Sequence, residues 1–152
     1  MMDFFKTARR KDSGYTVIIG CGRLGTSLAN AISDKEASVM MVDRDERAFR
    51  KLGAAYGGLT LTGDATDIAV LRSAEIERAD TVVSVTNDDN TNIMVAQIAR
   101  NLYHIPSVVC RLYDPEREVV YREFDIDTIC PTVLSAREID RLLGHETEAA
   151  GR

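Results

Sequence analysis

The chain has 152 residues, of which 45% are hydrophobic and 28% charged, and its formal net charge is −5. These values are ordinary for one soluble globular domain, which at this length buries on the order of 70% of its unfolded surface. The acidic balance gives no general attraction to nucleic acid, and no apolar stretch approaches the roughly 20 residues that cross a bilayer. We therefore expect a cytoplasmic protein without a nucleic-acid partner.

Residues 1–14 contain four basic and two acidic residues, and they carry two adjacent phenylalanines, Phe4 and Phe5. This composition predicts a flexible basic tail in front of the folded domain. Contact of the tail with a membrane surface or a partner is the alternative, because basic and aromatic residues favour both.

From Tyr15 onward, apolar runs typical of strands alternate with helical patterns. The strands are expected at residues 15–20, 38–43, 59–62, 81–86, 107–111 and 127–130, and the helices at 23–33, 46–56, 67–73, 90–103, 115–124 and 135–143. Several strands are continuously apolar, which is typical of a parallel sheet with helices on both faces. Six such units predict an α/β fold, a Rossmann-like doubly wound parallel sheet of six strands in the order 3-2-1-4-5-6.

Three helix ends carry local signals. Asp114 followed by Pro115 predicts an N-cap with proline in the first turn. Ser135 and Glu138 have the spacing of a capping box, and Gly144 is expected to end the last helix.

A glycine-rich loop, Gly20-Cys21-Gly22-Arg23-Leu24-Gly25, joins the first strand to the first helix. The first glycine permits a sharp turn, the second lets the backbone approach a phosphate, and the third lets helix and strand pack closely. Backbone amides at the helix start then face the phosphates. With Asp43 at the end of the second strand, the pattern predicts an adenine nucleotide site, a purely structural glycine turn being the alternative.

Asp43 can accept hydrogen bonds from both ribose hydroxyls, and a 2′-phosphate would be repelled there. The sequence therefore favours ATP, ADP, AMP or NAD(H) as ligand and makes NADP unfavourable. The neighbouring Arg44 is either a partner for a 2′-phosphate or a solvated surface residue.

Other candidate ligand contacts follow the strands in order. Arg23 can pair with a terminal phosphate or point to solvent. Asp64 and Ala65 lie where the adenine edge would come, although Asp64 can equally serve as the N-cap of the third helix. Thr86 follows the fourth strand and supplies a polar group, and Arg111 closes the fifth.

The three cysteines, Cys21, Cys110 and Cys130, match neither a zinc site nor a redox pair, and the histidines have no ligand cluster near them. We expect reduced cysteines and no metal site. A redox role for Cys21 is the alternative, because a helix start stabilises a thiolate.

The glycine loop, Asp43, and the segments 63–67, 79–83 and 131–133 together resemble the N-terminal RCK domain, the KTN or TrkA-N family of regulatory nucleotide-binding domains. The resemblance covers about residues 15–143. It implies a cytoplasmic subunit that forms a homo-dimer or higher ring beneath a membrane-embedded potassium transporter or channel. It further implies that bound ATP, ADP or NAD(H) controls the gating of that partner.

The family's functional residues map onto this chain by position. Its phosphate-loop arginine corresponds to Arg23, its ribose acid to Asp43, and its adenine-contacting pair to Asp64 and Ala65. Its basic residue on the fifth strand, near the phosphates or the dimer neighbour, corresponds to Arg111. We expect the nucleotide-binding domain over residues 15–144 and a short tail over 145–152, without a C-terminal RCK domain.

The first functional hypothesis is a switch without enzymatic activity. The second is an NAD-dependent oxidoreductase or an accessory subunit of one, which needs a proton donor and a substrate pocket. A redox regulator of transcription is disfavoured, because the chain has no basic helix-turn-helix segment.

Overall fold

The computed structural model describes residues 14–35 and 37–145. Almost all of the two predicted tails, 1–14 and 145–152, lies outside the described residues. Six strands form one sheet: β1 (Tyr15–Ile19), β2 (Ser38–Asp43), β3 (Leu59–Thr62), β4 (Thr81–Ser84), β5 (Ser107–Arg111) and β6 (Asp127–Ile129).

All neighbouring strands are parallel, and their order is β3-β2-β1-β4-β5-β6. The predicted doubly wound α/β fold is therefore confirmed. The chain reverses its direction of winding between β1 and β4, and ligands of open α/β sheets bind at this reversal, beyond the carboxyl ends of the strands.

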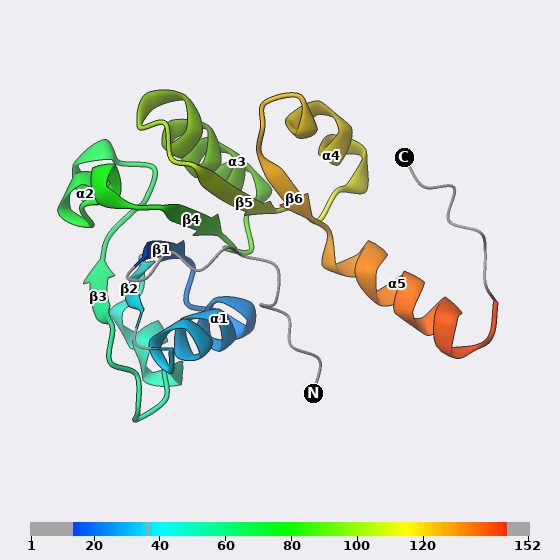
Figure 1. Cartoon of the computed structure of the whole chain (residues 1–152), viewed down its shortest axis with the longest axis horizontal. Helices are drawn as coiled ribbons and strands as arrows, with labels where there is room; N and C mark the ends of the chain where they lie inside the picture. Colours follow the sequence, from blue (N-terminus) through cyan, green and yellow to red (C-terminus); the bar gives the residue numbers. More distant parts are fainter. Residues whose placement is uncertain (1–13, 36, 146–152) are drawn as a thin grey trace.

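The described residues form five α-helices: α1 (Arg23–Ser33), α2 (Ile68–Ser73), α3 (Asp89–Gln97), α4 (Pro115–Arg122) and α5 (Pro131–Leu142). Short 3-10 segments lie at Glu46–Lys51 (η1) and Ile76–Arg78 (η2), and a π-helical turn, Ile98–Leu102 (η3), prolongs α3. In Figure 1, α2, α3 and α4 lie above the sheet and α1 lies below it.

Alternate residues of the central strands enter two separate hydrophobic cores. Val17, Met40 and Val82 pack with residues of α2, η2 and α3, whereas Ile18 and Met41 pack with α1 and η1. Side chains of a strand alternate between the two faces of the sheet, so a run of consecutive apolar residues is buried on both sides. This is why the central strands read as continuously apolar.

The helix expected at residues 46–56 is wrong beyond Lys51. Only the 3-10 segment Glu46–Lys51 forms, capped by the Asp45 carboxylate, and Leu52 is already extended. The following loop is held by the Tyr56 hydroxyl, which donates to the carbonyl of Leu59 at 2.8 Å. Phe49 and Leu52 pack on the hydrophobic core that contains Ile18 and Met41. These packing contacts and the Tyr56 hydrogen bond, and not helix propensity, determine the conformation of the segment.

The expected start of the last helix is also wrong. Helix α5 begins at Pro131 with Cys130 as N-cap, which places Ser135 and Glu138 inside the helix. The Ser135 to Glu138 spacing is therefore no capping box, and Glu138 pairs instead with Arg141. Gly144 follows the helix with a φ of 76°, the left-handed conformation in which glycine commonly ends a helix. The prediction that Gly144 ends the last helix is therefore confirmed.

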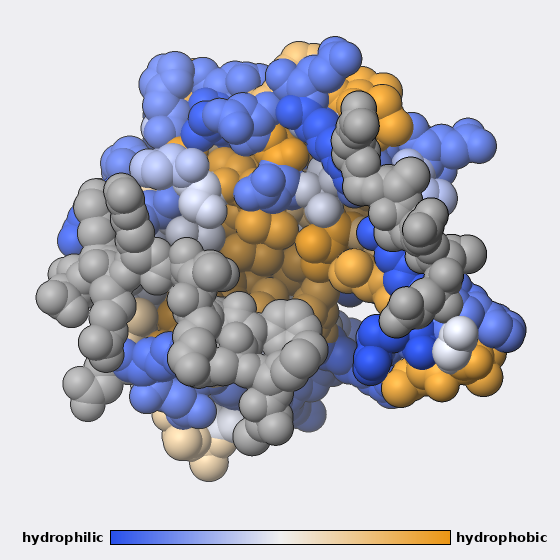
Figure 2. All heavy atoms as spheres, turned by 45° about the vertical axis from the view of Figure 1, so that its right-hand side comes forward, coloured by the Kyte–Doolittle hydropathy of each residue, from blue (hydrophilic) through white to orange (hydrophobic). Residues whose placement is uncertain are grey.

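Helix α5 extends away from the sheet (Figure 1), and none of its residues is buried. Its exposed large apolar side chains are Leu134, Ile139 and Leu142, with Leu143 just after the helix. Figure 2 shows an apolar group at the lower right of the molecule, where α5 ends. Among the described residues, no helix has the length and apolar content needed to cross a membrane.

Candidate functional site

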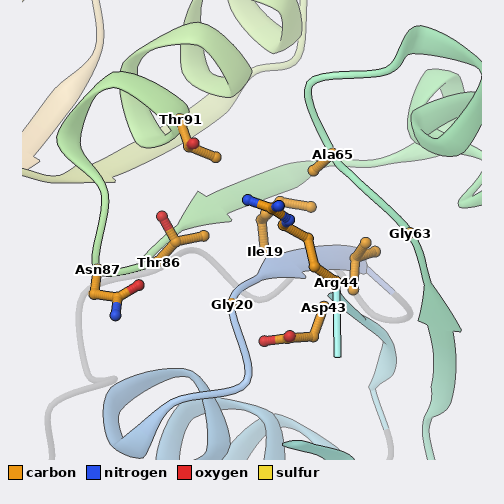
Figure 3. A pocket seen from close by; sticks show the side chains of 10 residues that line it. Ile19, Gly20, Asp43, Arg44, Gly63, Ala65, Thr86, Asn87 and Thr91 are labelled. Atoms are coloured by element: carbon orange, nitrogen blue, oxygen red, sulfur yellow. The ribbon is translucent and has the colours of Figure 1, made fainter. Parts of the chain in front are cut away.

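An open hollow lies at the carboxyl ends of β1 to β4, where the winding reverses (Figure 3). Its volume is about 400 Å³ when it is counted out to its open mouth. Apolar and polar groups share its wall, which is formed by Ile19, Gly20, Val42, Asp43, Arg44, Gly63, Ala65, Thr86, Asn87 and Thr91. An apolar hollow with a few convergent polar groups is the usual form of a small-molecule site.

Gly20 turns the chain from β1 into the loop with a φ of 106°, which other residues rarely adopt. A Cβ on Gly20 would also lie 2.8 Å from the Thr86 amide nitrogen. Gly25 allows α1 to pack on this turn, because a Cβ there would lie 1.8 Å from the Gly20 carbonyl oxygen. The predicted structural roles of the first and third glycines are confirmed.

Gly22 differs from both, because a Cβ on it would meet no protein atom within 4 Å. Its φ of −87° and ψ of −164° are open to any residue. Gly22 is the N-cap of α1, and the first turn of α1 contains no acidic side chain. The amides of Gly22, Arg23 and Leu24 have no hydrogen-bond partner among the described residues. The loop thus offers unpaired donors at the positive end of a helix.

Asp43 ties the end of β2 to the glycine loop. One of its carboxylate oxygens accepts from the Cys21 amide and the other from the Asp45 amide, each at 2.8 Å. A carboxylate has about four acceptor positions, so two remain for the hydroxyls of a ribose. The carboxylate therefore both shapes the loop and faces the hollow.

Asp64 is not the N-cap of the helix expected at residues 67–73, which is α2 in the structure. The cap of α2 is Asp67, whose carboxylate accepts from the Ala69 amide at 2.9 Å. One oxygen of Asp64 accepts from the amide and the hydroxyl of Thr66. These hydrogen bonds, together with the positive charge of Arg44, hold the pKa of Asp64 below its ordinary value. Its other oxygen accepts no hydrogen bond within the described chain.

The far wall of the hollow is built on Asn92, a fully buried side chain in α3 that the sequence analysis missed. Its amide oxygen accepts from the amide and hydroxyl of Thr86, at 2.8 and 2.7 Å, and from the Ser84 hydroxyl. Its amide nitrogen donates to the carbonyls of Thr86 and Arg111. Asn92 thus joins the ends of β4 and β5 and fixes Thr86 at the hollow.

Arg111 does not line the hollow in this structure. Its guanidinium donates to the Thr86 carbonyl at 2.7 Å and lies over the Tyr113 ring, 5.1 Å from the ring centre. Arg111 therefore supports the backbone of Thr86 from behind. Its contact with phosphates or with a neighbouring subunit stays a prediction.

The structure brings part of the predicted site together. Gly20, Asp43, Arg44, Ala65 and Thr86 line the hollow, whereas Cys21, Gly22, Arg23, Leu24, Gly25, Asp64 and Arg111 do not. Of the second set, Gly22 is the N-cap of α1 and Arg23 is the first residue of this helix. The lining residues absent from the prediction are Ile19, Val42, Gly63, Asn87 and Thr91. Their only sequence signal is their position at or just after the carboxyl ends of strands, or one turn into α3.

The alternative interpretation, a stabilised thiolate at Cys21, is wrong. The Cys21 side chain is 1% exposed and packs beside the Thr26 hydroxyl and the Ala48 carbonyl. Burial raises the pKa of the Cys21 thiol and raises that of Cys110 to about 12. All three cysteines are free and buried. Among the described residues, no group of histidine, cysteine or acidic side chains is arranged to hold a metal ion.

Comparison with known proteins identifies the family of the chain. The model of the TrkA-N domain family matches residues 16–132. The Trk system potassium uptake protein TrkA of Streptomyces coelicolor is 39% identical over 129 residues, which cover 85% of this chain and 58% of that protein. The chain thus spans somewhat more than half the length of this relative.

Two solved structures of GsuK share the fold. The structure of GsuK bound to ADP has a TM-score of 0.73 and 28% identity, covering 88% of this chain and 34% of that one. The GsuK channel bound to NAD has a TM-score of 0.73 and 28% identity, covering 92% and 25%. The resemblance inferred from the glycine loop, Asp43 and segment 63–67 is therefore confirmed, and this chain belongs to the TrkA-N domain family.

Proposed function

We propose that the hollow binds an adenine nucleotide and that the chain regulates a membrane-embedded potassium transporter or channel from the cytoplasmic side. The observation that carries the proposal is the space around Gly22. A Cβ on Gly22 would meet no protein atom within 4 Å, so packing within the chain does not require a glycine at this position. Gly22 is the N-cap of α1, the first amides of this helix are unpaired, and the helix start adjoins the hollow. A phosphate at this helix start would pair those amides and would explain the missing side chain.

The remaining lining groups suit the rest of the ligand. Asp43 would accept from the ribose hydroxyls, and the adenine would lie toward Ala65, with the free oxygen of Asp64 near its amino group. The ADP and NAD complexes of GsuK support this class of ligand. The charge of Asp43 disfavours the 2′-phosphate of NADP.

Regulation would follow from a difference in nucleotide affinity between two arrangements of the assembled protein. A ligand that binds one arrangement about 100-fold more tightly changes their ratio by the same factor. The exposed apolar side chains of α5 support assembly into a homo-dimer or ring. The similarity to TrkA supports a potassium uptake system as the partner.

We propose binding rather than catalysis at the hollow. An NAD-dependent oxidoreductase would need a proton donor facing the ligand. The Thr86 hydroxyl, which lines the hollow, already donates to Asn92. The potassium uptake relatives also support a regulatory role over hydride transfer.

Replacing Arg23 with alanine tests the phosphate end of the site. Arg23 is the first residue of α1, is exposed, and has no ion-pair or hydrogen-bond partner among the described residues. If its guanidinium pairs with a second or third phosphate, Arg23→Ala should weaken ADP and ATP binding about tenfold and AMP binding by less than about threefold. Isothermal titration calorimetry with AMP, ADP, ATP, NAD and NADH measures this, with light scattering of each complex to follow assembly.

Arg72→Ala is the matched control, because Arg72 is an exposed arginine in the last turn of α2 and does not line the hollow. It removes the same charge and should leave all affinities unchanged. Equal weakening of AMP and ATP by Arg23→Ala would contradict the assignment of Arg23 to a terminal phosphate. Absence of nucleotide binding to the unaltered chain would contradict the proposed function.

A further inference from the structure

Arg44 is an unpaired cation that lies across the hollow. Figure 3 shows its side chain extending from the end of β2 over the hollow, toward the side where Ala65 and Thr91 lie. It makes no hydrogen bond or ion pair with any described residue. Five other exposed arginines of the described chain pair with carboxylates: Arg47, Arg78, Arg117, Arg122 and Arg141. Arg23, Arg50 and Arg72 are exposed and make no ion pair with a described residue either, but Arg44 lines the hollow and these three do not.

Neither Asp43 nor Asp64 forms an ion pair with Arg44. Asp43 directs both oxygens to backbone amides, those of Cys21 and Asp45. Asp64 is close enough for an electrostatic effect, but one of its oxygens is committed to Thr66 and no ion pair with Arg44 forms. The guanidinium plane is therefore left free over the hollow.

The surface beneath this cation is apolar. Ile19, Val42 and Ala65 all line the hollow, and the rest of the chain shields all three almost completely from bulk solvent. A flat aromatic ring that lay on these apolar residues would have the planar cation of Arg44 beside its exposed face. A guanidinium stacks on such a ring through both its plane and its charge.

Resting on the proposed nucleotide function, we propose that Arg44 stacks on the base of the nucleotide and makes the site selective for purines. The larger two-ring face of adenine lies between Arg44 and the apolar residues of the hollow, whereas the single ring of a pyrimidine covers less of the guanidinium. Arg44 is thus the specificity-determining residue of the base end. It acts by contact with the base and not by pairing with a phosphate.

The nearby charge of Asp43 is the reason to favour the base over a 2′-phosphate as the partner of Arg44. A phosphate within reach of the guanidinium would also lie beside that carboxylate, where like charges repel. An aromatic base carries no net charge and meets no such repulsion. Recognition of a 2′-phosphate is therefore the competing outcome of the test.

The test compares AMP, CMP, NAD and NADP binding by calorimetry in the unaltered chain, Arg44→Ala and Arg44→Lys. Arg44→Ala should weaken AMP binding about tenfold and bring the AMP to CMP affinity ratio to within about threefold. Arg44→Lys should recover little of the loss, because an ammonium group has no plane to stack. In a nitrogen-15 spectrum, the Arg44 Nε–H signal of the unaltered chain should move upfield with AMP, because it then lies over the ring.

Arg50→Ala is the matched control, since Arg50 is an exposed arginine of η1 that does not line the hollow. It should leave the AMP to CMP ratio unchanged. Full recovery by Arg44→Lys with NADP binding more tightly than NAD would overturn base stacking in favour of phosphate pairing. Unchanged AMP binding by Arg44→Ala would overturn this inference alone, whereas no binding of any nucleotide to the unaltered chain would overturn the proposed function as well.

Discussion

Replacing Gly25 with alanine is expected to destabilise the fold by at least about 3 kcal/mol, a large part of the roughly 5–15 kcal/mol that stabilises a domain. The added Cβ would lie 1.8 Å from the Gly20 carbonyl oxygen and 3.4 Å from a methyl group of Val85. Gly20 cannot move away, because its amide bonds the Val42 carbonyl at 2.9 Å and its φ is already unusual. Helix α1 would have to shift from the sheet.

The sign of the change in stability caused by Gly25→Ala shows whether packing or helix propensity dominates at this position. Alanine is about 1 kcal/mol more favourable than glycine inside a helix, so propensity alone predicts that Gly25→Ala stabilises the chain. Urea unfolding followed by circular dichroism measures the change. Gly22→Ala is the control in the same loop, and its cost should not exceed about 1 kcal/mol, the loss of a good N-cap. A Gly25→Ala variant as stable as the unaltered chain would contradict the close packing of α1 on Gly20.

Replacing Asn92 with alanine is the second large effect that we expect. The change removes five hydrogen bonds and leaves the Thr86 amide and the Arg111 carbonyl without their Asn92 partner. Because Asn92 is fully buried, water cannot readily replace the lost amide group. Buried groups left unpaired cost about 1–3 kcal/mol each when unrelieved, so we expect a loss of about 3 kcal/mol in the free energy of unfolding.

The same urea unfolding measurement checks this value, with Asn101→Ala as the control. Asn101 is exposed in the π-helical turn that prolongs α3, so its replacement should change the stability by less than about 0.5 kcal/mol. Nucleotide affinity should also fall in folded Asn92→Ala, because Thr86 is no longer held at the hollow. If Asn92→Ala lowered the free energy of unfolding by less than about 1 kcal/mol, the connection between the ends of β4 and β5 would not depend on this side chain.

The strands and their order follow from the sequence because their pattern is physically constrained. Val17, Ile18 and Ile19 are apolar without alternation, and the structure buries them on both faces of the sheet. The glycine loop was equally informative, since Gly20 and Gly25 are needed for backbone geometry alone. Asp114 capping α4 is a local interaction and was predicted correctly.

The errors arose where a local signal competed with tertiary contacts. A helix was predicted over residues 46–56, but only a short 3-10 segment forms, Glu46–Lys51, because Phe49 and Leu52 are held by packing and Gly53 follows. The spacing of Ser135 and Glu138 suggested a cap, whereas Pro131 already occupies the first turn of α5. Proline in the first turn is the stronger signal, because its ring fixes φ at a helical value.

Residues of the candidate site could be predicted only where the residue type and its position in the chain together indicate one functional role. Asp43 was identified by its position at the end of β2, although its hydrogen bonds from the Cys21 and Asp45 amides were not. Asn92 gave no signal, because a polar residue near the start of a helix is ordinarily exposed and only the fold shows that Ser84, Thr86 and Arg111 surround it. The unpaired state of Arg44 likewise depends on where neighbouring carboxylates point.

The central claim is that an adenine nucleotide binds with its phosphates at the start of α1. The most direct measurement is calorimetric titration of ADP into the unaltered chain and into Gly22→Ala, with their urea unfolding compared in parallel. We predict that Gly22→Ala remains folded and loses at least about tenfold in ADP affinity, because the new methyl group meets no protein atom and can obstruct only the ligand. Equal ADP affinity in the two folded proteins, or no ADP binding by either, would contradict the account.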